Sequence, residues 1–248
     1  MMRCLRVVLP VALAWQLAPA FAAPPHLYIG TEISPPSSIM DNGQLAGYTT
    51  DKVREIMKRV GVVYEIELLP FKRAMLTAQT RPDACIYSLT RLPERDALFK
   101  WVGPTHISDW TLFGKAGRNY QVRTLEDARK YHIGAYFGDV RGDTLSAMGY
   151  TVETVRERLS NPRKLLADRL DLWVSSRQMG GSLIAENGWQ GQIVPVLSFK
   201  RTELYLACHL DVPDALIAKM NAALRAMNAE GVSTAIERKY MPVGTLPH

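Results

Sequence analysis

The sequence has little of the chemistry that marks metal sites and hydrolytic enzymes. Its 248 residues include three cysteines and five histidines. No CxxC pair occurs, and the histidines are too far apart for zinc-ligand spacing. The motifs GxSxG and HExxH, which carry a nucleophile or a metal-bound water, are missing. We therefore expect a protein without metal, cofactor or catalytic residues.

Blocks of like charge are also missing. The formal net charge is +6, yet Lys and Arg are interleaved with acids, and five like charges never follow one another. Such scattering is typical of a solvated surface rather than of a nucleic-acid-binding patch. We expect no nucleic-acid partner.

No apolar stretch reaches the roughly 20 residues that a membrane-spanning helix needs. The stretch at residues 7–17 is shorter, follows Arg3 and Arg6, and precedes Ala20-Phe21-Ala22. A basic start, a short apolar segment and a small-x-small tripeptide form a secretory signal peptide. We predict that residues 1–22 are a signal peptide, cleaved after Ala22, and that the mature chain is soluble in the periplasm.

Two cysteines, Cys85 and Cys208, remain in the mature chain. An oxidising compartment permits a disulfide between them. Both lie in apolar runs, however, where a free cysteine serves as a small hydrophobic residue. The sequence leaves both alternatives open.

The first half of the chain alternates short apolar runs with helical patterns. We predict strands at residues 27–31, 62–69 and 84–89, and helices at 50–60 and 71–79. Thr49 or Thr50 is the predicted cap of the first helix, and Gly61 ends it. This order favours a parallel sheet with right-handed crossovers.

The same alternation restarts near residue 110. Further strands are predicted at residues 110–115, 132–137, 151–155, 170–175, 193–199 and 203–209. A capping box at residues 124–127 predicts one of the intervening helices, and two helices follow the last strand. The fold class is therefore α/β, with two lobes. Ligands of open α/β sheets bind beyond the carboxyl ends of the strands, so the lobes should face each other across a binding cleft.

We expect the chain to divide into four parts. After the signal peptide, residues 23–107 form the first part of lobe I, residues 108–202 form lobe II, and residues 203–248 return to lobe I. This division predicts that Cys85 and Cys208 lie in the same lobe.

Three segments together resemble the bacterial extracellular solute-binding proteins of family 3, which serve polar amino acid uptake. They are residues 35–48, residues 83–95, and residues 203–207 with Lys239-Tyr240. The resemblance spans residues 26–241 in order and spacing. It implies a type II periplasmic-binding-protein fold, a ligand in the interlobe cleft, and a membrane ABC permease as partner. A monomer is expected.

The resemblance has departures. Asp51 stands at the acid position of the family's first helix, but Ser37 replaces the usual Phe of its "PPF" opening. In the ligand loop, Leu92 stands where the family has a second Thr, which removes one hydroxyl donor.

The ligand loop carries the candidate anchor for a carboxylate. In similar proteins the positions of Thr90 and Arg95 hold the ligand's α-carboxylate, and a planar guanidinium suits that group. Ser88 can add a hydroxyl, and Tyr87 belongs to the same set of ligand-binding candidates. The alternative is that Arg95 pairs with Glu94 or another surface acid.

Three further candidates precede this loop. Glu32 follows the first strand, where many family members have an acid that helps hold an ammonium group; otherwise it is a solvated loop acid. Phe71 and Arg73 open the next helix and could line the cleft. The alternatives are a core position for Phe71 and a surface position for Arg73.

The second lobe departs from the family pattern. Family members that bind amino acids have an Asp where this chain has Ser176. Asp139 either contacts the ligand or caps its own helix, since a helix N-terminus favours anions. Arg141 is the candidate for a second acidic group on the ligand, and Trp173 faces either the cleft or the core.

The sequence thus predicts a periplasmic receptor for a small polar ligand, an amino acid or related carboxylate. Its lobes should close by hinge motion near residues 107–109 and 201–203. Two alternatives remain. One is a periplasmic enzyme on the same fold, similar to cyclohexadienyl dehydratases, since fold alone does not define function. The other is a ligand-sensing module, which would need a membrane helix and a signalling domain that we do not expect here.

Overall fold

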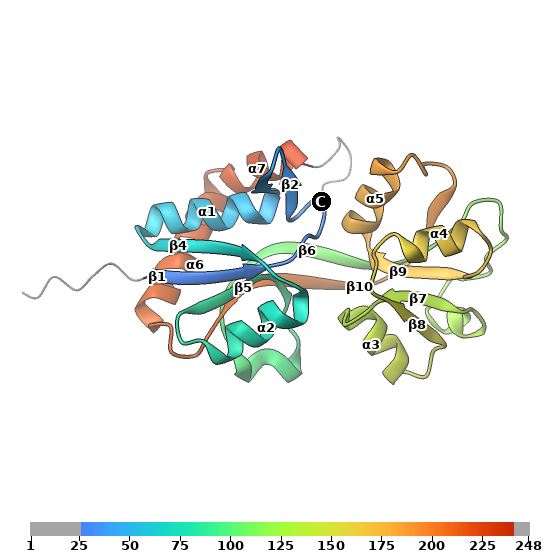
Figure 1. Ribbon diagram of the computed structural model, residues 1–248, viewed down its shortest axis with the longest axis horizontal. Coiled ribbons are helices and arrows are strands. Elements are labelled where there is room, and N and C mark those ends of the chain that lie inside the picture. The colour runs from blue at the N-terminus through green and yellow to red at the C-terminus, as the bar shows by residue number, and fades with distance from the viewer. Residues whose placement is uncertain (1–25, 241–248) are drawn as a thin grey trace, which may run out of the picture.

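The computed structural model describes residues 26–240 (Figure 1). The predicted signal peptide, residues 1–22, lies outside this part of the chain. Within the described residues, no helix combines the length and the apolar character needed to cross a membrane.

The first lobe is built on the predicted β-α-β-α-β order. Its elements are β1 (His26–Thr31), α1 (Tyr48–Val60), β4 (Val63–Leu68), α2 (Phe71–Thr80) and β5 (Ala84–Thr90). Strand β1 lies between β4 and β5 and pairs with both in parallel. This arrangement confirms the prediction and brings the carboxyl ends of β1 and β5 to one edge of the sheet.

Helix α1 begins at Tyr48, before both predicted caps. Its N-cap is Gly47, so Thr49 and Thr50 lie inside the first turn. Gly47 is required there, because a Cβ at this position would lie 2.4 Å from the carbonyl oxygen of Ser37. The predicted end is confirmed, since Gly61 caps the helix in the left-handed conformation with φ of 72°.

A small β-hairpin precedes α1, and its two strands were not predicted from the sequence. Strands β2 (Ile39–Asp41) and β3 (Gln44–Ala46) pair antiparallel across Asn42-Gly43, and both turn residues have positive φ. An Asn-Gly pair with this geometry is favoured in tight hairpins.

The second lobe repeats the α/β alternation on a smaller scale. Its strands and helices are β7 (Ile133–Tyr136), α3 (Val140–Ala147), β8 (Val152–Val155), α4 (Ser160–Leu166), β9 (Leu172–Ser176) and α5 (Arg177–Glu186). The predicted capping box does not open an α-helix. The Asp127 carboxylate instead accepts backbone N–H bonds from Arg123 and Thr124, and a short 3-10 helix, η2 (Glu126–Lys130), follows.

Two long strands run through both lobes. Strands β6 (Lys100–Lys115) and β10 (Ile193–Cys208) pair antiparallel, and together with the other strands they form one eight-stranded sheet in the order β4-β1-β5-β10-β6-β9-β7-β8. Figure 1 shows them as the connection between the lobes. The predicted separate strands at 193–199 and 203–209 are therefore wrong, because the polar segment between them continues the strand.

The core consists of four apolar clusters in two groups. Two clusters contain residues from β1, α1, α2 and β5 together with β10 and the last helices, α6 (Asp214–Ala229) and α7 (Val232–Tyr240). The other two contain residues between Leu112 and Phe199. The exact lobe boundaries at 107/108 and 202/203 stay a prediction. The two segments at which the chain is predicted to cross between the lobes are neighbours in the sheet, with Ser108 opposite Thr202.

Cys85 and Cys208 form a disulfide between facing positions of β5 and β10. Both cysteines belong to one apolar cluster, as predicted for residues of one lobe, and the bond decides between the two alternatives that the sequence left open. It closes a loop with a sequence separation of 123 residues.

Reduction of this disulfide should lower the free energy of unfolding by about 2–4 kcal/mol, because a long loop regains its freedom in the unfolded chain. Urea unfolding with and without dithiothreitol measures the difference, and the double variant Cys85→Ala/Cys208→Ala should be insensitive to the reductant. Equal midpoints for the native chain in both conditions would contradict this expectation.

Candidate functional site

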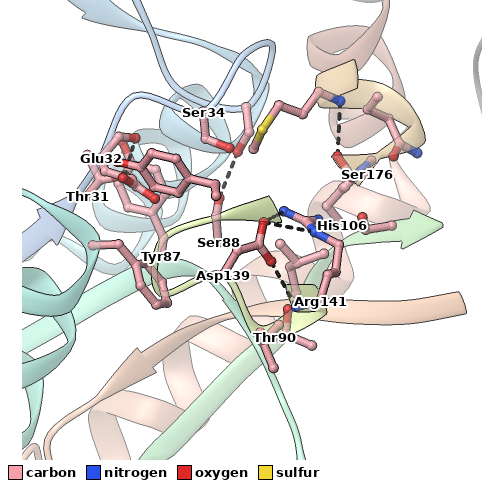
Figure 2. Close-up of a pocket in the computed structure, with 18 of the residues that line it drawn as sticks. Thr31, Glu32, Ser34, Tyr87, Ser88, Thr90, His106, Asp139, Arg141 and Ser176 are labelled. Carbon is pink, nitrogen blue, oxygen red and sulfur yellow. Dashed lines mark hydrogen bonds and ion pairs between the residues drawn. The ribbon is translucent and has the colours of Figure 1, made fainter. Parts of the chain in front are cut away.

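A cleft lies between the two lobes at the carboxyl ends of the sheet strands. Its walls include Thr31 at the end of β1 and Glu32 just beyond it, Ser88 and Thr90 of β5, and Ser176 at the end of β9. Figure 2 shows these side chains converging on one space. The position follows from the topology, because side chains after parallel strands meet at the same edge of the sheet.

Arg95 lines this cleft, and the acids that act on it lie beyond ion-pair distance. It lies in the 3-10 helix η1 (Pro93–Leu98), and its Nη1 is 3.4 Å from the carbonyl oxygen of Thr90. Across residues 26–240, no carboxylate lies within 4 Å of its guanidinium, so the alternative pairing with Glu94 is not observed. Burial is the largest influence on the pKa of Arg95 and lowers it, while the carboxylates of Glu94, Asp143 and Asp139 act from farther away in the opposite direction.

Its neighbour Arg91 behaves differently. Its Nε lies 2.6 Å from the Asp96 carboxylate, outside the cleft. Two arginines of one loop therefore differ in role: Arg91 is neutralised at the surface, and Arg95 is available to an anion.

The hydroxyls beside Arg95 form a connected set. Ser88 has a φ of 60°, and its Oγ lies 2.7 Å from Oγ of Ser37, which in turn donates to Thr49. Ser37, which replaces the family's Phe, thus contributes a polar wall. Tyr87 differs, since its hydroxyl bonds Thr50 at 2.7 Å and its ring is buried in the core.

An ion pair joins the two lobes across the cleft. Oε2 of Glu32, in lobe I, lies 2.8 Å from Nη2 of Arg158, in lobe II, and both side chains are about one-fifth exposed. The Arg158 guanidinium also stacks over Tyr136, 4.3 Å from the ring centre. Burial raises the pKa of Glu32, while Arg158 opposes that shift. Glu32 is therefore a paired cleft acid rather than a solvated one.

Sequence reasoning missed Arg158. A signal existed, because Arg158 comes three positions after the end of β8 and Glu32 comes one position after the end of β1. Nothing local indicated that these two ends would meet.

Asp139 and Arg141 satisfy each other on the opposite wall. Asp139 caps α3, accepting the backbone N–H of Arg141 at 2.9 Å, and its carboxylate also accepts Nε and Nη2 of Arg141 at 3.0 and 2.6 Å (Figure 2). The predicted capping alternative for Asp139 is confirmed. Ser176 is likewise a cap, since its Oγ accepts the N–H of Met179 at 3.0 Å.

Two predicted residues do not line the cleft. Arg73 is exposed on α2, and Trp173 is buried in the lobe II core, where its ring centre lies 5.2 Å from that of Phe113. Trp173 stands three positions before Ser176 on β9, and this odd separation places the two side chains on opposite faces of the strand. Phe71 lines the cleft and also packs on the core.

A buried polar cluster under the cleft was not predicted. His106 of β6 stacks on Tyr48 with 4.6 Å between ring centres, and its Nδ1 lies 3.8 Å from Oε1 of Glu237. The same carboxylate oxygen is 2.5 Å from Nζ of Lys52, which also donates to the carbonyl of Thr105 at 2.8 Å. The cluster connects α1, β6 and α7 beneath the cleft floor.

His106 should make the stability of the chain sensitive to mild acid. Burial lowers its pKa below the ordinary 6.5, so between these two values the unfolded chain binds a proton that the folded chain does not. The corresponding stability is fully present above about pH 6.5 and is lost as the pH falls through the folded pKa. His106→Gln should flatten the fall in unfolding free energy below pH 6.5 by up to about 1.4 kcal/mol per pH unit. Urea titrations at several pH values measure the slope, and an unchanged slope would contradict the assignment.

No group of three or more His, Cys, Asp or Glu side chains is placed to hold a metal ion in the part of the chain that the structure describes. The cleft's chemistry rests instead on guanidinium, carboxylate and hydroxyl groups.

Comparison with known proteins agrees with this architecture. The profile of bacterial extracellular solute-binding proteins, family 3, matches residues 27–243. A search of curated protein sequences finds no significant match.

Several solved structures have the same fold. A histidine kinase sensor domain with similarity to periplasmic binding proteins superposes with a TM-score of 0.81 at 21% identity, covering 91% of this chain and 99% of the other. An arginine-, lysine-, histidine-binding protein from Geobacillus stearothermophilus gives 0.76 at 17% identity, with coverages of 90% and 96%. An arginine-bound amino acid ABC transporter substrate-binding protein from Streptococcus pneumoniae gives 0.76 at 13%, with coverages of 87% and 94%. These likenesses establish the two-lobed type II periplasmic-binding-protein fold.

Proposed function

The chain belongs to the bacterial extracellular solute-binding proteins of family 3, and we propose that it captures a small polar carboxylate in the interlobe cleft and delivers it to a membrane ABC permease. The observation that carries this proposal is Arg95, a part-buried guanidinium that faces the cleft with no acid within 4 Å among residues 26–240. A carboxylate would complete its coordination with a fork of two hydrogen bonds.

The neighbouring hydroxyls support the same role. Ser88 and Thr90 lie at the end of β5 beside Arg95, and both line the cleft. Hydroxyl donors next to a guanidinium satisfy the remaining lone pairs of a bound carboxylate. The anchor therefore belongs to lobe I alone, so a ligand binds this lobe first and the second lobe closes over it.

Closure would occur about the paired segments 107–109 and 201–203. Thr202 Oγ1 donates to the carbonyl of Ser108 at 3.2 Å, so the two crossing strands move together. The ion pair of Glu32 with Arg158 forms between the lobes and favours the closed arrangement. Hinge closure around a ligand is a common motion of two-lobed binding proteins.

Export, permease docking and a monomeric state complete the proposal. The signal-peptide pattern at residues 1–22 supports delivery to the periplasm. The streptococcal neighbour, described as the substrate-binding protein of an amino acid ABC transporter, supports the permease partner.

A ligand-sensing module is the second candidate. The histidine kinase sensor domain, with a TM-score of 0.81, favours it, because that protein is described as a sensor with similarity to periplasmic binding proteins. Uptake of radiolabelled ligand by cells with and without the gene separates the two roles, since only a transport receptor is required for uptake.

The proposal is tested by a thermal-shift screen of the mature chain against amino acids, polyamines and small carboxylates. A ligand present at about 100 times its dissociation constant adds about 2.7 kcal/mol to the free energy of unfolding. Carboxylates should raise the melting temperature and polyamines should not. Product analysis of the same mixtures by NMR should recover the ligand unchanged; turnover would favour the enzyme alternative.

A further inference from the structure

Among the charged side chains that line the cleft, the positive ones outnumber the negative ones. They are three arginines and two acids, which gives the cleft a formal charge of +1: Arg95, Arg141, Arg158, Glu32 and Asp139. Each acid already has an arginine partner, Glu32 at 2.8 Å and Asp139 at 2.6 Å. Among the described residues that line the cleft, Arg95 is the charged side chain without an ion-pair partner, and Glu94, Asp143 and Asp139 act on it only from beyond 4 Å.

We propose that the natural ligand is a small monoanion, a carboxylate that carries no cationic group, such as a 2-hydroxy acid, rather than an amino acid. This inference rests on the proposed function and names its ligand class. A zwitterion needs an acid for its ammonium group, and the cleft offers none that is free among the described residues.

Glu32 is not available to an ammonium group. Its partner Arg158 is held from three sides, by the Glu32 carboxylate, by the Tyr136 ring at 4.3 Å, and by Sδ of Met179 at 3.4 Å. An ammonium that displaced Arg158 would leave a guanidinium without its partner in a place that is four-fifths buried, and such a charge is costly.

Asp139 is even less available to an ammonium group than Glu32. One oxygen accepts the backbone N–H of Arg141, and the other accepts two N–H groups of the Arg141 side chain. Both carboxylate oxygens are thus used within the first turn of α3. Displacing them would uncap the helix as well as break the pair.

The end of β9 presents no charged side chain to the cleft. Ser176 stands at the end of β9, and its hydroxyl accepts the N–H of Met179. Beside it lie Gln178 and Ser108, which are uncharged and suit a hydroxyl or carbonyl group. The ring of Phe71 and the side chain of Ile86 provide apolar walls for the rest of the ligand.

The first test uses matched pairs of probes in isothermal titration. Each amino acid is compared with the 2-hydroxy acid that has the same side chain: alanine with lactate, leucine with 2-hydroxyisocaproate, and phenylalanine with phenyllactate; L-arginine is added alone. The hydroxy acid should bind at least tenfold more tightly in any pair that binds. Equal or tighter binding of an amino acid, or saturable binding of L-arginine, would overturn the inference and leave the proposed function standing. No binding by either member of any pair would count against both.

The second test changes the charge balance. Arg158→Gln frees Glu32 for an ammonium and removes one positive charge, so it should shift the preference at least tenfold toward the amino acid of each pair. Arg156→Gln is the matched control, because Arg156 is exposed, stacks on Phe137 and does not line the cleft. A preference that is the same in Arg158→Gln and in the unaltered chain would contradict the proposal.

Discussion

Arg95→Ala should weaken binding of a carboxylate ligand by at least about tenfold, which corresponds to about 1.4 kcal/mol. Each hydrogen bond to a charged group contributes about 1.5–3 kcal/mol, and the fork makes two. The loss is large because a carboxylate would be left desolvated beside hydroxyls alone. Isothermal titration with the tightest carboxylate of the thermal-shift screen measures the effect.

Two further variants make this result specific. Arg95→Lys should recover only part of the affinity, because an ammonium cannot reproduce the planar fork. Arg91→Ala should bind like the unaltered chain, since Arg91 belongs to the same loop but pairs with Asp96 outside the cleft. Unchanged affinity in Arg95→Ala, with an intact circular dichroism spectrum, would mean that the anchor has been assigned to the wrong residue.

Glu237→Ala should destabilise the fold by about 3–5 kcal/mol, as expected when one partner of a buried ion pair is removed. Lys52 is 4% exposed, and Glu237 lies 2.5 Å from its Nζ. Without Glu237 the ammonium keeps the carbonyl of Thr105 and must either stay unpaired or lose its proton. Because α7 packs on α1 through this contact, the effect should appear as a lower urea midpoint of the whole chain.

The matched control is Glu230→Ala. Glu230 also forms an ion pair, because its Oε2 lies 2.7 Å from Nη2 of Arg59, but the Glu230 side chain is 51% exposed. Exposed pairs contribute about 0–1 kcal/mol, so this variant should differ little from the unaltered chain. Equal losses in the two variants would contradict the view that burial, rather than pairing, makes Lys52 and Glu237 important.

Local patterns were sufficient to predict the β-α-β-α-β order of the first lobe. The β-α-β-α-β order followed from apolar runs and from the spacing of Val53, Ile56 and Met57, all of which are fully buried in the core. Gly61 marked the end of α1 because only glycine takes its left-handed conformation without cost. Such signals lie within a few residues of one another and do not depend on the rest of the chain.

The crossing strands and the cleft pairs could not be found in this way. Residues 200–203 are polar and mostly exposed, so they resemble a loop, and only pairing with β6 makes them a strand. Glu32 and Arg158 come from separate lobes, and Lys52 and Glu237 are 185 residues apart. Tertiary packing decides which charged side chains pair with each other. It therefore also decides which charged side chain is left to bind a ligand.

The same difference applies within the candidate site. Arg95, Thr90 and Ser88 were predicted because they share one loop whose pattern resembles that of the family. Arg73 and Trp173 were chosen by proximity in sequence to a cleft edge, and the direction of a side chain on a helix or strand excluded both.

The most direct test of the account is one titration of the purified mature chain with the tightest carboxylate of the screen, followed by recovery of that compound. We expect saturation at one molecule per chain, a loss of at least about tenfold in affinity for Arg95→Ala, and an unchanged compound after prolonged incubation. Conversion of the compound into a product, or no saturable binding by any carboxylate, would contradict it.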